Sequence, residues 1–98
     1  MSYFLIAPRF PGGRLLVSDR ITALRIPIIP LICRHLSGDW GEEICPDDVA
    51  ANNAALIHGD ALLSHFSAFT ESGERMVVSI FTEADRSVTV AFIEGEDC

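Results

Sequence analysis

Two polar stretches hold most of the side chains that could do chemistry, RHLSGDWG at Arg34–Gly41 and TEADRS at Thr82–Ser87. In the first, His35 and Asp39 could act as a general base and the carboxylate that orients it. Glu83, in the second stretch, could supply a further acid. No Gly-x-Ser-x-Gly and no cysteine signature provides a nucleophile. An enzyme using these three side chains stays one hypothesis, and the alternative is that His35 packs at a helix end while Asp39 caps a turn.

Metal-ligating side chains are present but poorly spaced. None shows C-x-x-C or H-x₃₋₅-H spacing; they are Cys33, Cys45, Cys98, His35, His58 and His65. Cys33 and His35 are two positions apart on a predicted helix, so they point to different sides. No glycine-rich phosphate loop or dinucleotide fingerprint occurs. We therefore expect no metal, no cofactor and free thiols in a reducing compartment.

Acidic residues dominate the later part of the chain. Five arginines against one aspartate give +4 over residues 1–37, and two arginines against thirteen acids give −11 over residues 38–98, which together make the net −7. There is no lysine. This charge argues against direct nucleic-acid binding. It suits docking onto a basic surface of a protein, including one that normally holds nucleic acid.

The predicted partner-binding surface combines these acids with one aromatic side chain. It comprises Asp39, Trp40, Glu42, Glu43, Asp47, Asp48, Asp60, Glu83 and Asp85. Trp40 is either an interface hot spot or a lid over the edge of the core. The acid pairs at 42–43 and 47–48 could instead hold a divalent ion, or simply be solvated acids around a helix N-terminus. A second predicted set is a structural polar cluster of Arg34, His35, Asn52, Asn53, Thr82 and Arg86, with Asn53 bonded to a nearby loop.

Capping residues and apolar periodicity locate the elements that position these groups. A short strand is predicted first, and then helices, one of them starting at Ser18, one at Pro30 and stopped by Gly38, and one from Pro46 to Gly59. From residue 61 the period changes from about 3.6 to 2, which predicts three strands. The predicted strands are 14–17, 61–69, 75–82 and 87–93, with a possible further extended edge at Tyr3–Ala7 and a frayed acidic tail at 94–98.

These elements predict one α+β domain over residues 1–98: a three- to four-stranded antiparallel sheet with two to three helices between residues 19 and 58 on one face. The predicted core is Phe66, Val78, Ile80, Val88, Val90 and Phe92. The run Ile26–Cys33 is too short to span a membrane. No basic segment precedes the apolar N-terminal stretch, so we expect no signal peptide and a location in the bacterial cytosol.

Four short sequence motifs, taken together and in this order, resemble those of one family: RHLSGDWG at Arg34–Gly41, NNAAL at Asn52–Leu56, LLS at Leu62–Ser64 and FTEADRSVT at Phe81–Thr89. The chain is similar, over roughly residues 13–93, to the small plasmid-related proteins of bacterial plasmids and integrative elements. The ending AFIEGEDC departs from the family pattern. The resemblance implies a mobile-element context and a shared polar structure that joins helix ends to the 82–87 turn, and it carries over no catalytic residue.

Three functions follow as hypotheses. The first is an inhibitor that occupies the basic surface of a nucleic-acid-targeting defence complex, of the anti-CRISPR or anti-restriction type. The second is a homodimeric structural or regulatory module, with the Ile26–Ile32 stretch as its interface. The third is the enzyme using His35, Asp39 and Glu83. Size, charge and resemblance favour the first.

Overall fold

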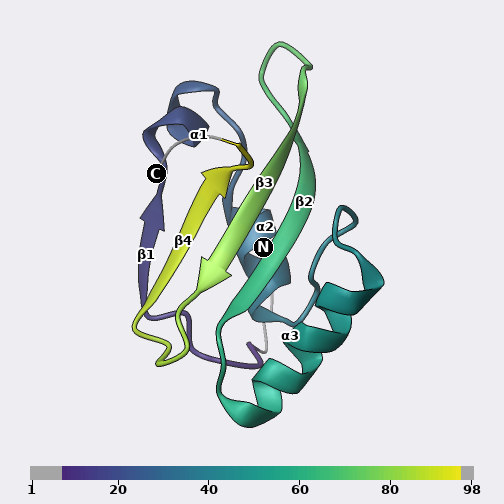
Figure 1. The fold of residues 1–98 in the computed structure, drawn as a ribbon. Coiled ribbons are helices and arrows are strands. Elements are labelled where there is room, and N and C mark those ends of the chain that lie inside the picture. Colours follow the sequence, from purple (N-terminus) through teal and green to yellow (C-terminus); the bar gives the residue numbers. More distant parts are fainter. Residues whose placement is uncertain (1–7, 96–98) are drawn as a thin grey trace, which may run out of the picture.

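A computed structural model describes residues 8–95 of the chain, which form one mixed four-stranded sheet and three helices (Figure 1). Tyr3–Ala7 and residues 96–98 lie outside the described residues. The strands run in the spatial order β1-β4-β3-β2. In chain order the elements are β1 (Arg14–Val17), α1 (Asp19–Ala23), α2 (Ile29–Leu36), α3 (Pro46–His58), β2 (Leu62–Phe69), β3 (Arg75–Thr82) and β4 (Val88–Ile93).

The α+β class and the C-terminal antiparallel meander are confirmed, and β1 does join the sheet. The prediction of a wholly antiparallel sheet is wrong, because β1 pairs parallel to β4, with Leu16 opposite Val90. The three helices carry the chain from β1 to the far edge of the sheet. The two following turns then bring β4 back beside β1 in the same direction.

The helix ends follow from local chemistry. The Ser18 hydroxyl accepts a hydrogen bond from the Ile21 amide and so caps α1. Gly38 follows α2 with a φ of +85°, and Gly59 ends α3 with a φ of +79°, which are left-handed conformations that glycine adopts without strain. Within residues 8–95 no helix combines the length and apolar character required to cross a bilayer.

The main hydrophobic core lies between α1, α2 and one face of the sheet. Phe66, Val78 and Ile80 belong to it, as predicted. The other three predicted core residues, Val88, Val90 and Phe92, are wrong: their neighbours Thr89, Ala91 and Ile93 are the buried set of β4. Both sets are apolar enough to be buried, so alternation alone could not decide which one faces the helices.

The stretch predicted as a dimer interface is used inside the monomer. Ile26, Leu31 and Ile32 are buried in the main core, and Ile29 is exposed. A second, smaller cluster fills the space between α3, the edge of β2 and the loop before α3; it consists of Phe10, Trp40, Ala55 and Leu62. Figure 1 shows α3 lying beside β2 at that edge.

Candidate functional site

A buried chain of hydrogen bonds is centred on His35, in the last turn of α2. The imidazole is fully buried, with Nδ1 against the Ser64 hydroxyl and Nε2 2.8 Å from Thr82 Oγ1. Thr82 Oγ1 lies 2.8 Å from Thr89 Oγ1, which donates to the Gly12 carbonyl at 2.7 Å. One helix, three strands and the segment before β1 therefore meet in a single polar layer.

The carbonyl at the end of this chain fixes the direction of every proton. Thr89 gives its hydroxyl proton to Gly12, so it accepts from Thr82. Thr82 has then used its proton and accepts from His35 Nε2–H. His35 Nδ1 is left as the acceptor of the Ser64 hydroxyl. The layer is fully satisfied only with a neutral histidine protonated on Nε2.

Burial is the main cause that lowers the pKa of His35 to about 4, and the positive charge of Arg86 lowers it further. A hydroxyl donating to a neutral imidazole is the contact that nucleophilic catalysis uses. Here the Ser64 hydroxyl and the imidazole are both fully buried. The pair therefore satisfies polar groups inside the fold and has no open position for a substrate.

Trp40 is removed from the predicted binding surface. Its side chain is 5 % exposed, and its indole N–H donates to Asn53 Oδ1 at 3.0 Å, which confirms the predicted bond between Asn53 and the loop. The Trp40 ring stacks on Phe10 and meets the edge of His35, with centroid separations of 6.3 and 5.8 Å. Large aromatic area is most stabilising when buried, and this loop tryptophan serves as a lid over the polar layer.

The loop that carries Trp40 also closes the free edge of β2. The His65 amide donates to the Trp40 carbonyl at 3.0 Å, and the His65 carbonyl accepts from the Glu43 amide at 3.1 Å. Asn52 on α3 does the same for Leu63, donating to its carbonyl at 2.7 Å and accepting from its amide at 3.1 Å. Backbone groups of an edge strand otherwise invite pairing with another chain. Asn52 therefore has a structural role, within the predicted polar cluster.

Three of the predicted binding carboxylates are paired with arginines. Arg34 donates to Asp39 at 2.7 Å and to Glu42 at 3.0 Å, and Arg75 pairs with Glu43. The Arg34 guanidinium holds the pKa of Asp39 below its usual range, helped by the Gly41 amide. Both His35 ring nitrogens are bonded to hydroxyls, of Ser64 and Thr82, so Asp39 does not orient the imidazole. The predicted base and carboxylate are not brought together.

Arg86 ties the turn after β3 to the end of α3. Its guanidinium donates to the carbonyls of Asp60 at 2.7 Å, Glu83 at 3.1 Å and Ala55 at 3.4 Å. All three of these bonds go to backbone oxygens. The Ala55 and Glu83 carbonyls also accept backbone amides, from Gly59 and Arg86, so the guanidinium adds a further bond to each. These bonds also hold Asp60 and Glu83 next to each other.

Five predicted carboxylates remain exposed without an arginine pair among the described residues: Asp47, Asp48, Asp60, Glu83 and Asp85. The first two lie at the N-terminus of α3, where Asp48 accepts from the Cys45 thiol. The other three lie near its C-terminus, roughly 18 Å away by helix rise. In the described part of the chain, no three His, Cys, Asp or Glu side chains are grouped as a metal ion requires.

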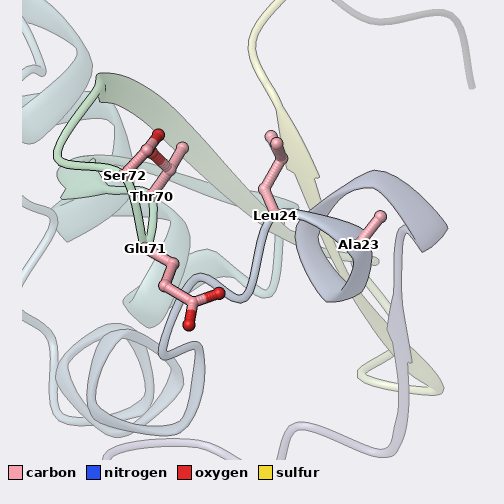
Figure 2. A pocket seen from close by; sticks show the side chains of 5 residues that line it. All are labelled: Ala23, Leu24, Thr70, Glu71 and Ser72. Atoms are coloured by element: carbon pink, nitrogen blue, oxygen red, sulfur yellow. The ribbon is translucent and has the colours of Figure 1, made fainter.

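Of three hollows on the described surface, one touches the outer end of the polar layer, at Gly12 and Thr89, and none reaches His35. One of about 350 Å³ lies between the end of α1, at Ala23 and Leu24, and the β2–β3 hairpin (Figure 2). Its hairpin wall is Thr70, Glu71 and Ser72, and the Glu71 carboxylate pairs with Arg25. Two others, of about 200 and 180 Å³, adjoin Leu63 and Leu15. His35 and Ser64 line none of these three.

Comparison with known proteins gives no match: no family model fits the chain, and no curated protein or solved structure is significantly similar to it. The site must therefore be interpreted from its own contacts. Sequence reasoning missed Ser64, Thr89 and Phe10 as members of the polar layer and its aromatic wall. A signal for Thr89 exists, since it is the one hydroxyl residue in the otherwise apolar strand β4; Ser64 shares β2 with His65 and Ser67 and does not stand out.

Replacing Ser64 by alanine is expected to lower the free energy of unfolding by about 1–3 kcal/mol, because His35 Nδ1 is left buried without a donor. Chemical denaturation measures this loss. The matched control is Ser67→Ala on the same strand, where the lost partner is an exposed Arg75, and the change should stay below about 1 kcal/mol. Equal losses in the two variants would contradict a satisfied polar layer.

Proposed function

We propose that this chain is a non-catalytic protein-binding module of a mobile element. Its free carboxylates occupy a basic, nucleic-acid-binding surface of a host defence complex and so inhibit that complex. The observation that carries the proposal is which polar side chains are bonded within the fold and which remain exposed. The side chains of His35 and Asp39, which could have taken part in catalysis, are hydrogen-bonded to other residues of the fold. Asp60, Glu83 and Asp85, in contrast, are exposed at one end of the sheet.

The arrangement around Arg86 supports this acidic end, defined here as Asp60, Glu83 and Asp85. The Arg86 guanidinium points inward, with its carbon 5.4 Å from the centre of the Phe10 ring, and its bonds go to backbone carbonyls. The nearest fixed cation is thus engaged while the neighbouring carboxylates face solvent. Carboxylates in that setting steer a basic partner from a distance.

The enzyme hypothesis has less support. His35 is bonded on both ring nitrogens, Asp39 is bonded to Arg34, and Glu83 lies in the exposed turn after β3. No two of these side chains are partners. A reaction would need them around one accessible atom.

The test expresses the chain in bacteria that carry either an active CRISPR system or a restriction enzyme, and measures phage plaquing. Wild-type chain should raise plaquing by at least about tenfold in one of the two strains. The triple variant Asp60→Asn, Glu83→Gln, Asp85→Asn should lose most of that protection. In vitro, inhibition of DNA binding by the purified effector should weaken as salt rises.

A matched variant separates local charge from total charge. Asp19→Asn, Glu74→Gln, Glu94→Gln removes three other exposed carboxylates and changes the net charge from −7 to −4, as the first triple does. It should keep protection. Protection lost equally in both variants would show that total charge acts, and no protection by the wild-type chain in either strain would overturn the proposal.

A further inference from the structure

The face of the sheet opposite α1 and α2 is mostly apolar, with His65, Ser67 and Ser79 as its polar members, and has no described element packed over its middle. Register places one set of side chains on it, because they alternate with core residues along each strand and pair across the sheet with one another or, for Val88 and Phe69, with Arg14 and Arg75 at its ends. We call this set the open face. It consists of Leu16, Leu63, His65, Ser67, Phe69, Val77, Ser79, Phe81, Val88, Val90 and Phe92.

The middle of the open face is densely packed. Val90 lies between Leu16 and Phe81 on the neighbouring strands, and Phe92 lies opposite Ser79. Ser79 is 1 % exposed although it points away from the helices. On β4 the larger apolar set, Val88, Val90 and Phe92, is the one turned to this face. Contiguous apolar surface of this extent is rare on soluble monomers and marks a contact site.

Charged side chains lie around the rim of this surface, and no strand position in its middle is charged. Arg14, which pairs with Val88, stands at one end of the sheet, and Arg75, which pairs with Phe69 and binds Glu43, stands at the other. At the β2 edge, Asp48 on α3 lines a hollow with Leu63, His65 and Phe81. The surface complementary to the middle is therefore neutral and apolar.

A second copy of the chain provides such a surface and leaves the carboxylates of both copies outside the middle of the contact. The strands have four, six, eight and eight residues and lie about 4.8 Å apart, so they present roughly 400 Å² in projection, before the relief of the side chains is added. A standard interface buries about 800 Å² per partner. The open face supplies about half of that area in projection, and two such faces interdigitate in aligned sheet packing.

We propose that two copies of this chain pack through their open faces as a two-fold symmetric dimer, with the sheets inside and the helices outside. In such an isologous contact the same patch serves both copies. The inference is independent of the acidic end, which lies in the turns and can be presented twice by the dimer.

Light scattering on the full chain tests this. Wild type should have a mass of about 21 kDa, twice the 10.7 kDa of one chain. Val90→Glu places a charge in the centre of the face and should give the mass of one chain. Ile57→Glu is the control, because Ile57 is 81 % exposed on α3 and away from the open face, and this variant should remain dimeric.

Circular dichroism establishes that each variant is folded. Should Val90→Glu unfold, the milder Val90→Thr keeps a β-branched strand residue and should raise the dimer dissociation constant at least tenfold, measured by dilution. A wild-type mass of one chain at every concentration would overturn the proposal. So would a folded Val90→Glu that stays dimeric, or a Val90→Thr with an unchanged dissociation constant.

Discussion

Lowering the pH from about 7 to about 4 is expected to reduce the free energy of unfolding by about 3 kcal/mol through His35 alone. Burial lowers its pKa from 6.5 to about 4 in the folded chain. At pH values between these two pKa values, His35 is mostly protonated in the unfolded chain and mostly neutral in the folded chain. The stabilisation is therefore complete above pH 6.5 and is lost as the pH falls through the folded pKa.

The contacts of His35 explain why its imidazole does not bind a second proton in the folded chain. A protonated imidazole donates from both nitrogens, so Ser64 would have to turn from donor to acceptor at Nδ1 and its own proton would lose the imidazole as its acceptor. Thr82 accepts from Nε2–H in either state and gains nothing from protonation. Protonation would also bury a positive charge, in the field of Arg86, which is unfavourable.

Urea denaturation at a series of pH values measures this effect when wild type is compared with His35→Gln. The variant should be less stable at neutral pH by about 1–3 kcal/mol, since a glutamine cannot bond both partners. Its stability should fall much less between pH 6.5 and pH 4. The control is His58→Gln, an exposed position in the last turn of α3. Parallel curves for wild type and His35→Gln would show that another group carries the dependence.

Local signals predicted the elements of this fold well. Ser18, Gly38 and Gly59 mark helix ends because each satisfies or tolerates a backbone geometry that its own segment imposes. The hairpin at Thr70–Glu74 is equally local, with the Glu74 amide bonded to Thr70 Oγ1 at 3.1 Å. Such features need no knowledge of the rest of the chain, and their predicted positions agree with the structure to within about two residues.

The direction of β1 and the orientation of β4 were not predictable, because both depend on contacts distant in sequence. Thr89 bonds to Gly12 across 77 positions, and Thr82 bonds to His35 across 47. If β4 instead turned Val88, Val90 and Phe92 toward the helices, Thr89 would leave the polar layer, and the hydrogen bonds from Thr82 to Thr89 and from Thr89 to Gly12 would be lost. The cost of unsatisfied polar groups exceeds the gain from slightly larger apolar side chains. A polar layer therefore decides which face of an apolar sheet receives the helices.

The candidate binding residues also divide into features that the local sequence predicts and features that depend on contacts distant in sequence. Acidic composition was visible in the sequence, but the pairing of Glu43 with Arg75, 32 positions away, was not. The sequence left Trp40 open between an interface hot spot and a lid over the core edge, since its loop is polar on both sides. Its burial depends on Phe10, which approaches from a segment 30 positions earlier. Composition predicts the charge of a surface, and only the fold determines which charges are free.

Gly41→Ala is expected to destabilise the chain by more than about 3 kcal/mol, whereas Gly73→Ala should cost only about 1–2 kcal/mol. Both glycines have left-handed backbones, with φ of +93° and +89°. They differ in their surroundings. A Cβ on Gly41 would lie 2.0 Å from the His65 carbonyl oxygen, while nothing lies within 4 Å of one on Gly73.

The excess cost of Gly41→Ala has a definite origin. The His65 carbonyl belongs to β2 in the sheet and cannot shift, so the loop must leave the strand edge. That releases the two backbone bonds at His65, worth about 1 kcal/mol each, and uncovers Trp40, worth about 2–3 kcal/mol of buried apolar area. Urea denaturation gives the two free energies, and tryptophan fluorescence of folded Gly41→Ala should shift to the red. Equal losses for the two variants, with the emission unchanged, would mean that backbone strain alone is measured and that the loop does not seal the edge.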